Sequence, residues 1–250
     1  MKNMVRTCAV VVMAVSTLVL LSLKKPGIAE KDLIGAWSYG TPQNKTVMIA
    51  TDNVFSVAVY DLSGKRFIHS YGGTWKLQGN KLVKTIEWNS KDSSQVGKEI
   101  SEDVQINNGK LAIKQTNETW NQLDDGTPGA LKGAWIISGN FNNDKAVKRS
   151  NPFYPRRTMK VLSGKHFHWI AYNVGNKSFA NAGGGTYTTN NGKYTENIEF
   201  FTKTSESVGK SLQFDYSFVD GDWRHKGEKS TGGAMDECWT KREKFEAKPM

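Results

Sequence analysis

The sequence predicts an all-β protein made of two tandem up-and-down antiparallel β-barrels, preceded by an N-terminal signal segment. Three observations support this fold class. Short motifs recur in the same order in both halves of the chain, alternating apolar and polar residues run between turn dipeptides, and an uncharged stretch follows two basic residues at the N-terminus. Helical periodicity is almost absent, so strands must supply the core.

The first 29 residues are typical of a signal peptide. Lys2 and Arg6 precede an uncharged run over residues 7–23, and Gly27 to Ala29 offer small residues for cleavage. The run has 17 residues, fewer than the roughly 20 that span a bilayer, and an uncleaved membrane anchor is the alternative. We therefore expect a secreted, periplasmic or cell-envelope protein, which meets a membrane only through this segment if it stays uncleaved.

Composition narrows the partners and the stabilising chemistry. The formal net charge is +10, but the lysines are scattered among aromatic and acidic residues, a distribution that disfavours a nucleic-acid partner. Cys8 falls in the signal segment, so Cys238 would be alone in the mature chain and could form no disulfide within it. We expect packing alone to hold the fold.

The internal repeat defines two units. Its matching segments are residues 33–37 with 131–135, 62–67 with 162–167, 72–75 with 184–187, 86–88 with 198–200, 96–98 with 208–210, and 118–120 with 237–239. The offset between partners grows along the chain from 98 to 119, as expected if the second copy carries loop insertions. The boundaries are 30–124 for the first barrel, 125–130 for a linker rich in turn formers, and 131–250 for the second barrel.

The predicted strands follow one another as hairpins. In the first unit they are residues 55–60, 66–71, 73–77, 81–88, 102–106 and 110–115. In the second unit they are residues 158–162, 166–172, 184–189, 193–201, 211–219, 223–227 and 234–241. Turn dipeptides such as Asn191-Gly192 and Asp220-Gly221 separate them. A meander of this length usually closes into a barrel, because closure removes the exposed edges.

Several motifs carry a resemblance to a known family. Each unit has Gly-x-Trp just before its first strand, at 35–37 and 133–135, and the second unit adds Gly-Gly-Gly-Thr-Tyr-Thr (183–188), Tyr-Thr-Glu-Asn-Ile-Glu-Phe-Phe (194–201), Val-Gly-Lys (208–210), Gly-Asp-Trp (221–223) and Glu-Cys-Trp (237–239). With these motifs the chain resembles the lipocalin and calycin superfamily across residues 33–242. The second unit looks like the short lipocalin-like secreted or membrane proteins of Bacteroidetes.

The resemblance implies eight-stranded barrels, export and a small ligand, and it does not imply an enzyme. It also implies that Trp37 and Trp135 each close one barrel end, and that Arg242 packs near Trp135. The first unit has no arginine just after Trp120, so its end must be closed differently.

Alternation along the second unit assigns the side chains of its lumen. It places Phe167 and Trp169 inward and His166 and His168 outward into solvent. Along a further strand it favours inward positions for Leu212, Phe214, Tyr216 and Phe218. On the strand over 194–200 the pattern is less clear: if Ile198 and Phe200 point inward, Tyr194 and Glu196 do too. The candidate ligand-binding residues are Tyr194, Glu196, Phe214, Tyr216, Trp223, Glu237 and Trp239.

The chemistry of these residues leaves alternatives. Glu196 and Glu237 could satisfy buried donors, contact a ligand, or act as an acid and base pair. His166 and His168 share one face, but a metal would need a third ligand from His69, His225 or a carboxylate, and we expect none. The glycines at 183–185 precede a strand and predict a bulge or a close backbone approach.

No nucleophile elbow, phosphate loop or zinc-protease motif is present in the sequence, so we expect no catalytic residue and no cofactor. The resulting hypothesis is an exported, non-enzymatic, lipocalin-like protein that binds a small amphipathic or polar-aromatic ligand in its second barrel. The alternatives are an envelope-associated structural or interaction protein with filled barrels and, less favoured, a cyclase or isomerase.

Overall fold

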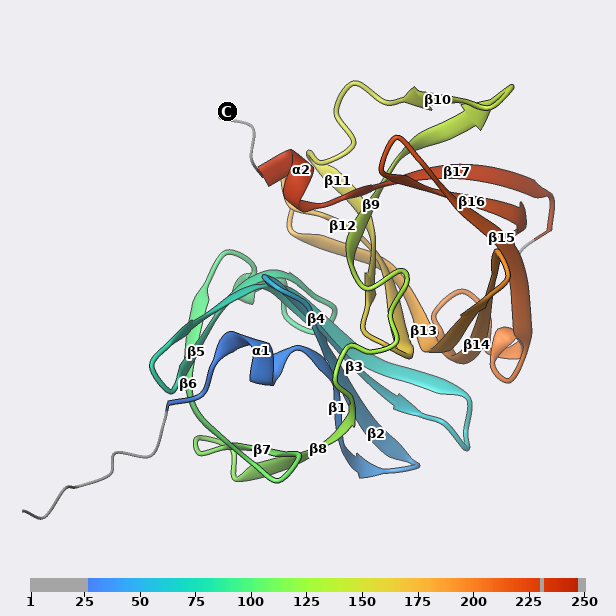
Figure 1. Cartoon of the computed structure of the whole chain (residues 1–250). Helices are drawn as coiled ribbons and strands as arrows, with labels where there is room; N and C mark the ends of the chain where they lie inside the picture. Colours follow the sequence, from blue (N-terminus) through green and yellow to red (C-terminus); the bar gives the residue numbers. More distant parts are fainter. Residues whose placement is uncertain (1–26, 230–231, 247–250) are drawn as a thin grey trace, which may run out of the picture.

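The first barrel closes on itself through strands β1 to β8. The computed structural model describes residues 27–229 and 232–246, so the signal segment predicted over 1–29 lies outside the described residues except for its last three. Each strand pairs antiparallel with the next, and β1 pairs with β8 to close the ring (Figure 1). The elements of this barrel are α1 (Glu30–Leu33), β1 (Gly35–Thr41), β2 (Asn44–Ala50), β3 (Val54–Asp61), β4 (Arg66–Gln78), β5 (Lys81–Asn89), η1 (Ser93–Gln95), β6 (Glu99–Asn107), β7 (Lys110–Ile113) and β8 (Glu118–Asp124).

The second barrel has the same order with one added strand. Its ring is β9 followed by β11 to β17, closed by pairing of β17 with β9, and β10 pairs with β9 in a hairpin that projects from the ring (Figure 1). Its elements are β9 (Gly133–Asn142), β10 (Lys145–Lys148), β11 (Arg156–Leu162), β12 (His166–Asn173), β13 (Ser178–Asn190), β14 (Lys193–Phe201), η2 (Ser205–Ser207), β15 (Ser211–Val219), β16 (Asp222–Glu228), β17 (Ala234–Lys241) and α2 (Glu243–Glu246). Two tandem closed antiparallel barrels confirm the predicted fold class.

Strand registers give the true correspondence between the barrels and correct one predicted match. The pairs Met48–Val57 in barrel 1 and Lys160–Trp169 in barrel 2 occupy the same place, so the offset is already 112 at β2. Phe167 is therefore equivalent to Phe55, and the match of 62–67 with 162–167 is wrong. It joined the turn after β3 to the turn after β11, which share a Leu-Ser-Gly-Lys sequence but not a place in the fold.

The predicted strand list also needs correction. Residues 66–71 and 73–77 form one strand, β4. The strands β1, β2, β8, β9 and β10 were not among the predicted ranges. The glycine run at 183–185 does mark a bulge, because the register of β13 on β14 shifts between Gly184 and Gly185. A Cβ at Gly185 would lie 2.0 Å from the Asn197 carbonyl oxygen, which explains why the position needs glycine.

Side chains fill the lumen of barrel 1. The tryptophans Trp37, Trp75 and Trp120 form its core with aliphatic residues from strands β2 to β7. Leu33 of α1 joins this core, and Figure 1 shows α1 at one opening of the ring. The Trp37 indole donates a hydrogen bond to the Leu33 carbonyl at 2.8 Å, which fixes α1 there. Trp135 bonds the Leu131 carbonyl in the same way in barrel 2.

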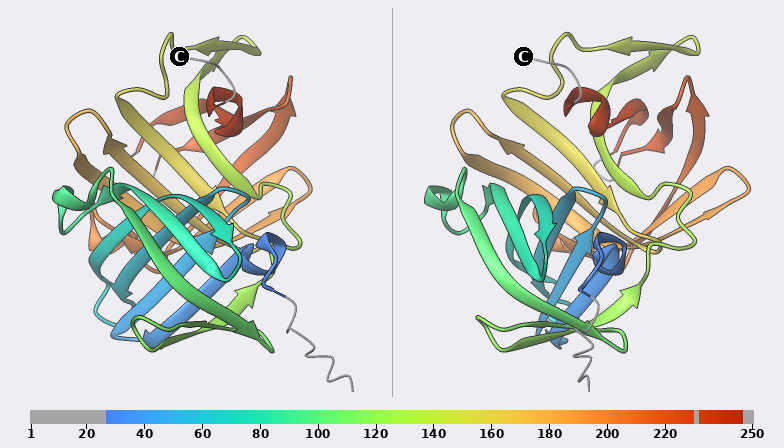
Figure 2. Two further views of the ribbon diagram at one scale, coloured as in Figure 1. Left: turned by 90° about the vertical axis from the view of Figure 1, so that its left-hand side faces the viewer. Right: turned by 60° about the vertical axis from the view of Figure 1, so that its left-hand side comes forward.

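The two barrels pack through equivalent faces, so the interface has approximate two-fold symmetry. Equivalent residues meet on the axis: Phe67 stacks on Phe179 with ring centroids 5.9 Å apart, and the Ser56 hydroxyl lies 2.9 Å from Nδ1 of His168. Away from the axis, contacts come in matched pairs. Tyr60 stacks on Phe200 at 4.9 Å, and the equivalent Trp88 packs on Tyr172 at 5.0 Å. Figure 2 shows the two barrels lying against each other. This is the isologous geometry of a symmetric dimer, formed here within one chain.

Two glutamates repeat the symmetry in polar contacts. The Tyr60 hydroxyl donates to Glu199 of barrel 2, and the equivalent Tyr172 hydroxyl donates to Glu87 of barrel 1 at 2.7 Å. Lys45 adds an ion pair to Glu199 at 2.8 Å. Glu87 is held more strongly, because Arg242 binds both of its oxygens at 2.6 and 2.8 Å and Arg157 lies 2.9 Å from it.

These contacts correct three sequence-based placements. His166 and His168 point out of the barrel as predicted, but both are buried, because His168 lies in the interface and His166 bonds Asp124. Phe200 points into the interface rather than the lumen, because the bulge at Glu199 reverses the alternation before it. Arg242 binds Glu87, and the cation over the Trp135 ring is Lys241, with its ammonium 4.5 Å from the ring centroid.

Asp124 ties the connection between the barrels to barrel 2. Its carboxylate accepts hydrogen bonds from the Ser163 hydroxyl at 2.8 Å and the Gly164 amide at 2.9 Å, and it lies 2.8 Å from Nδ1 of His166. Burial by itself raises the pKa of this carboxyl, but these hydrogen bonds outweigh it and lower the pKa to about 2. The end of β8 is therefore a buried polar junction.

Candidate functional site

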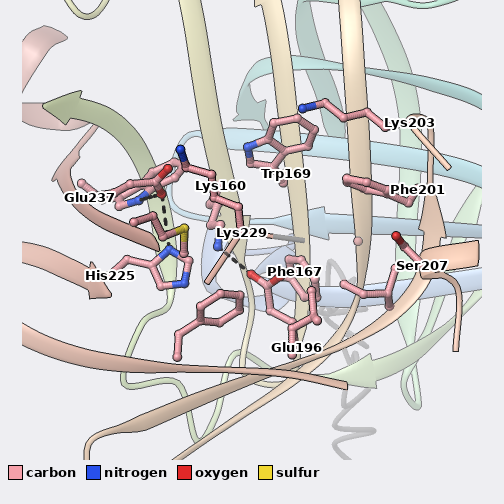
Figure 3. Close-up of a pocket in the computed structure, with 17 residues that line it drawn as sticks. Lys160, Phe167, Trp169, Glu196, Phe201, Lys203, Ser207, His225, Lys229 and Glu237 are labelled. Carbon is pink, nitrogen blue, oxygen red and sulfur yellow. Dashed lines mark hydrogen bonds and ion pairs between the residues drawn. The ribbon is translucent and has the colours of Figure 1, made fainter. Parts of the chain in front are cut away.

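Barrel 2 contains a cavity of about 190 Å³ inside its lumen (Figure 3). Aromatic and aliphatic side chains form most of its wall, and charged groups lie at its inner end and at its mouth. The lining residues are Lys160, Phe167, Trp169, Gly183, Gly184, Glu196, Ile198, Phe201, Lys203, Ser207, Leu212, Phe214, His225, Lys229, Met235, Glu237 and Trp239.

The structure brings four of the seven predicted lumen residues to this cavity. Glu196, Phe214, Glu237 and Trp239 line it. Tyr194 and Trp223 are fully buried in the aromatic core and do not line it. Tyr216 packs against the same core but is half-buried and also lies away from the cavity.

Phe218 departs from its predicted position. Half of its surface is exposed, and its ring stacks on Trp135 with centroids 6.1 Å apart. It lies one residue before the end of β15, and alternation along a strand does not tell where the lumen ends.

Lys160 and His225 were not among the predicted site residues. Lys160 lies on β11 opposite Trp169, and His225 lies on β16 two residues after the inward Trp223. Alternation from Trp223 would have placed His225 inward. Lys160 could have been predicted to point inward from the correct repeat offset of 112, which aligns it with Met48 of the barrel 1 core.

Lys160 forms a buried ion pair within an aromatic cage. Its ammonium lies 2.6 Å from Oε1 of Glu196, and both side chains are almost fully buried (Figure 3). The ring centroids of Tyr194, Trp223 and Trp239 lie 5.0, 5.2 and 5.4 Å from the same nitrogen. The carboxylate and the negative ring faces together compensate the ammonium for its lost hydration.

Glu237 and His225 form the second polar pair. The carboxylate of Glu237 accepts a hydrogen bond from the Trp239 indole at 3.0 Å and lies 3.5 Å from Nδ1 of His225. Burial alone raises the pKa of Glu237, but His225, Lys160 and Trp239 outweigh it, so the pKa lies below its ordinary value. Burial and the nearby Lys160 lower the pKa of His225 to about 4. At neutral pH Glu237 is therefore ionised and His225 is neutral.

Unpartnered polar atoms gather around this inner end. Among the described residues, the buried atoms that lack a hydrogen-bond partner include the Tyr194 hydroxyl, the Trp223 indole nitrogen and both ring nitrogens of His225. His225 lines the cavity although it is only 2% exposed. Buried polar groups are nearly always hydrogen-bonded, so such a cluster needs an explanation.

The equivalent positions of barrel 1 provide an internal comparison. Where barrel 2 has Lys160, Tyr194, Trp223 and His225, barrel 1 has four aliphatic residues of its core: Met48, Leu82, Leu111 and Ile113. Barrel 1 also has Tyr71 where barrel 2 has Gly183 at the cavity wall. Barrel 1 has a different buried polar pair nearby, because Lys84, at the position of Glu196, lies 2.7 Å from Glu102, at the position of Phe214. The fold therefore requires no polar side chain at the positions of Lys160, Tyr194, Trp223 and His225.

Other candidate chemistries have less support in the described structure. Across the residues that the structure describes, His, Cys, Asp and Glu side chains form no group of three that could hold a metal ion. Within 27–229 and 232–246, no helix is long and apolar enough to cross a membrane. Cys238 is buried against Ser138, with the Ser138 hydroxyl 3.3 Å from its sulfur.

Comparison with known proteins does not extend this description. No protein-family model and no curated protein matches the chain. The two closed eight-stranded antiparallel barrels are compatible with a lipocalin-like fold.

Proposed function

We propose that the chain is an exported, non-enzymatic, lipocalin-like protein whose second barrel binds a small amphipathic or polar-aromatic ligand. The proposal includes kinship with the calycin superfamily, through the Gly-x-Trp motifs and the barrel-forming meander, and secretion or residence in the cell envelope, through the N-terminal segment. Barrel 1, with its filled lumen, serves as the packing partner of barrel 2.

The observation that carries the proposal is the polar inner end of the cavity. His225 is buried and lines the cavity, its Nε2 has no partner, and its Nδ1 has only the Glu237 carboxylate at 3.5 Å. An unmade hydrogen bond of a buried group costs about 1–3 kcal/mol, and barrel 1 shows that an isoleucine serves the fold at this position. A ligand that forms a hydrogen bond with His225 accounts for the presence of a residue that otherwise lowers the stability of the fold.

The size of the cavity fits a small ligand. A volume of about 190 Å³ exceeds that of an apolar cavity of about 150 Å³ that binds benzene. The aromatic rings of Phe167, Trp169 and Phe201 give it walls suited to an apolar body, and the inner groups suit a polar end.

Catalysis by the two carboxylates has less support. Glu196 is held in its ion pair with Lys160, and Glu237 is bonded to Trp239 and faces His225. If the protein is instead a cyclase or isomerase, replacing Glu196 and Glu237 together by glutamine should abolish turnover.

Native mass spectrometry of the protein, purified gently and then exposed to a small-molecule extract of its source cells, tests the proposal. We expect an extra mass that is released on denaturation. Leu212→Trp should block this uptake, because Leu212 lines the cavity. The matched control is Ile100→Trp at the equivalent position of barrel 1, which should leave uptake unchanged. A bare polypeptide mass before and after exposure would contradict ligand binding and favour the filled-barrel structural role.

A further inference from the structure

The charged groups at the inner end of the cavity already have partners. Lys160 is paired with Glu196 at 2.6 Å, and Glu237 accepts the Trp239 indole proton at 3.0 Å. A ligand that brought a full charge there would have to compete with one of these contacts, and burying an extra charge in a narrow lumen is costly.

The unpartnered groups at the same place are all uncharged. They are the neutral imidazole of His225, the Tyr194 hydroxyl and the Trp223 indole. Of these His225 lines the cavity, and its side chain lies beside Lys160, which has N–H groups beyond the one that Glu196 accepts (Figure 3). A neutral imidazole has one donor and one acceptor nitrogen, and Nδ1 of His225 is the donor because it lies 3.5 Å from the ionised carboxylate of Glu237. Nε2 is therefore an acceptor without a partner, and it pairs best with an uncharged donor such as a hydroxyl group.

Flat rings enclose the space above this inner end. Phe167, Trp169 and Phe201 line it from β12 and β14, and Phe214 and Trp239 line it from β15 and β17. Aromatic pairs in offset or edge-to-face contact are stabilised beyond the area they bury. A planar aromatic body would therefore fit these walls better than a flexible chain, which would also lose more conformational entropy on binding.

We propose that barrel 2 selects a planar aromatic ligand whose inner end carries an uncharged hydroxyl group that donates a hydrogen bond to Nε2 of His225. This inference rests on the proposed ligand-binding function and specifies its ligand class. Barrel 1, with Ile113 in place of His225, lacks the group that would recognise such a ligand.

Four single-ring probes of similar size test the inference on the full chain by ligand-observed NMR titration. 1-Phenylethanol carries an uncharged hydroxyl group, cumene has nearly the same shape without a polar atom, benzoate is an anion, and benzylammonium is a cation. We expect 1-phenylethanol to bind tightest, about threefold to tenfold tighter than cumene, the range that one neutral hydrogen bond contributes. The two ions should bind more weakly than cumene.

His225→Ile, which installs the barrel 1 residue, should remove the preference for 1-phenylethanol and retain cumene binding. His69→Ile is the matched control, because His69 bonds Ser90 on barrel 1, outside the cavity lining. If all probes bind the wild type equally well, or if His225→Ile still prefers the uncharged polar probe over cumene, the proposal that His225 selects the ligand is wrong. The proposal that barrel 2 binds a ligand would remain. Tightest binding of benzoate or benzylammonium would overturn the uncharged class. If no probe binds but native mass spectrometry shows a carried ligand, the assignment to aromatic ligands is wrong. If no probe binds and native mass spectrometry shows no ligand, the proposed function itself is wrong.

Discussion

Replacing Glu87 by glutamine would test whether one buried carboxylate holds the two barrels together. Glu87 lies on β5 of barrel 1, and all of its strong partners come from barrel 2: Arg242, Arg157 and Tyr172. The side chains of Arg242 and Glu87 are 3% and 15% exposed, so water screens the pair little. Glutamine keeps the shape of the residue but removes the charge that two guanidinium groups face.

The size of the effect follows from the perturbed ionisation. Burial alone raises the pKa of Glu87, but the hydrogen bonds and charge of Arg242, with Arg157 and Tyr172, outweigh it and lower the pKa from 4.5 to about 2. Such a shift corresponds to about 3 kcal/mol of stability at neutral pH. Removing one partner of a buried ion pair costs about 3–5 kcal/mol in general, which agrees. We expect Glu87→Gln to lower the free energy of unfolding by about 3 kcal/mol.

Urea unfolding followed by tryptophan fluorescence measures this difference. Glu199→Gln is the matched control, because Glu199 is the symmetry-equivalent residue and faces only Lys45 and Tyr60 across the interface. Its loss should cost about 1 kcal/mol. The folded pKa of Glu87 is depressed, so its contribution is complete above about pH 4.5 and is lost as pH falls toward about 2. The gap between wild type and Glu87→Gln should therefore close over that range. A Glu87→Gln effect no larger than that of Glu199→Gln would refute the reasoning.

Three further predictions concern other parts of the chain. Asp124→Asn should lower the free energy of unfolding, measured in urea, by about 1–3 kcal/mol, because the amide is a poorer acceptor for Gly164 and His166. This difference from wild type should shrink as pH falls from about 4 to about 2, where the wild-type carboxylate takes up its proton. A difference that stays constant over this pH range would contradict the account. Lys160→Met should lower the free energy of unfolding by about 3–5 kcal/mol, because it leaves Glu196 unpaired. The double variant Lys160→Met with Glu196→Leu should recover most of the lost stability. If thermal unfolding shows the double variant to be no more stable than the single one, the pairing is disproved. Lys241→Met should lower the free energy of unfolding by only about 0.5–1 kcal/mol, the size of an exposed cation–π contact with Trp135. Arg242→Met should lower it clearly more, because it leaves Glu87 without its closest partner. If urea unfolding shows Lys241→Met to be the more destabilising variant, Arg242 would again be the cation that packs near Trp135.

Much of the fold could be predicted because its signals are local. Alternation with a period of two and turn dipeptides such as Asn191-Gly192 depend on neighbouring residues, and they placed β14, β15 and β17 with the bounds that the structure has. The internal repeat then predicted that the chain forms two barrels.

The same local pattern placed part of the site. Glu196 and Glu237 were predicted to point inward from their spacing to apolar neighbours, and both line the cavity. Alternation fails where an extra residue enters a strand, and the bulge at Glu199 therefore turned Phe200 to the opposite face. It also fails at strand ends, as Phe218 shows.

What the tertiary structure alone decided is how the two barrels meet and which polar groups remain without partners. The outward apolar residues Val47, Ala58 and Phe200 belong to an interface, and a strand covered on both faces no longer shows which face is the lumen. The pairing of Arg242 with Glu87 joins residues 155 positions apart. The isolation of His225 depends on the side chains of several strands at once. Local periodicity carries no information about such contacts, because they arise only when distant segments are packed together.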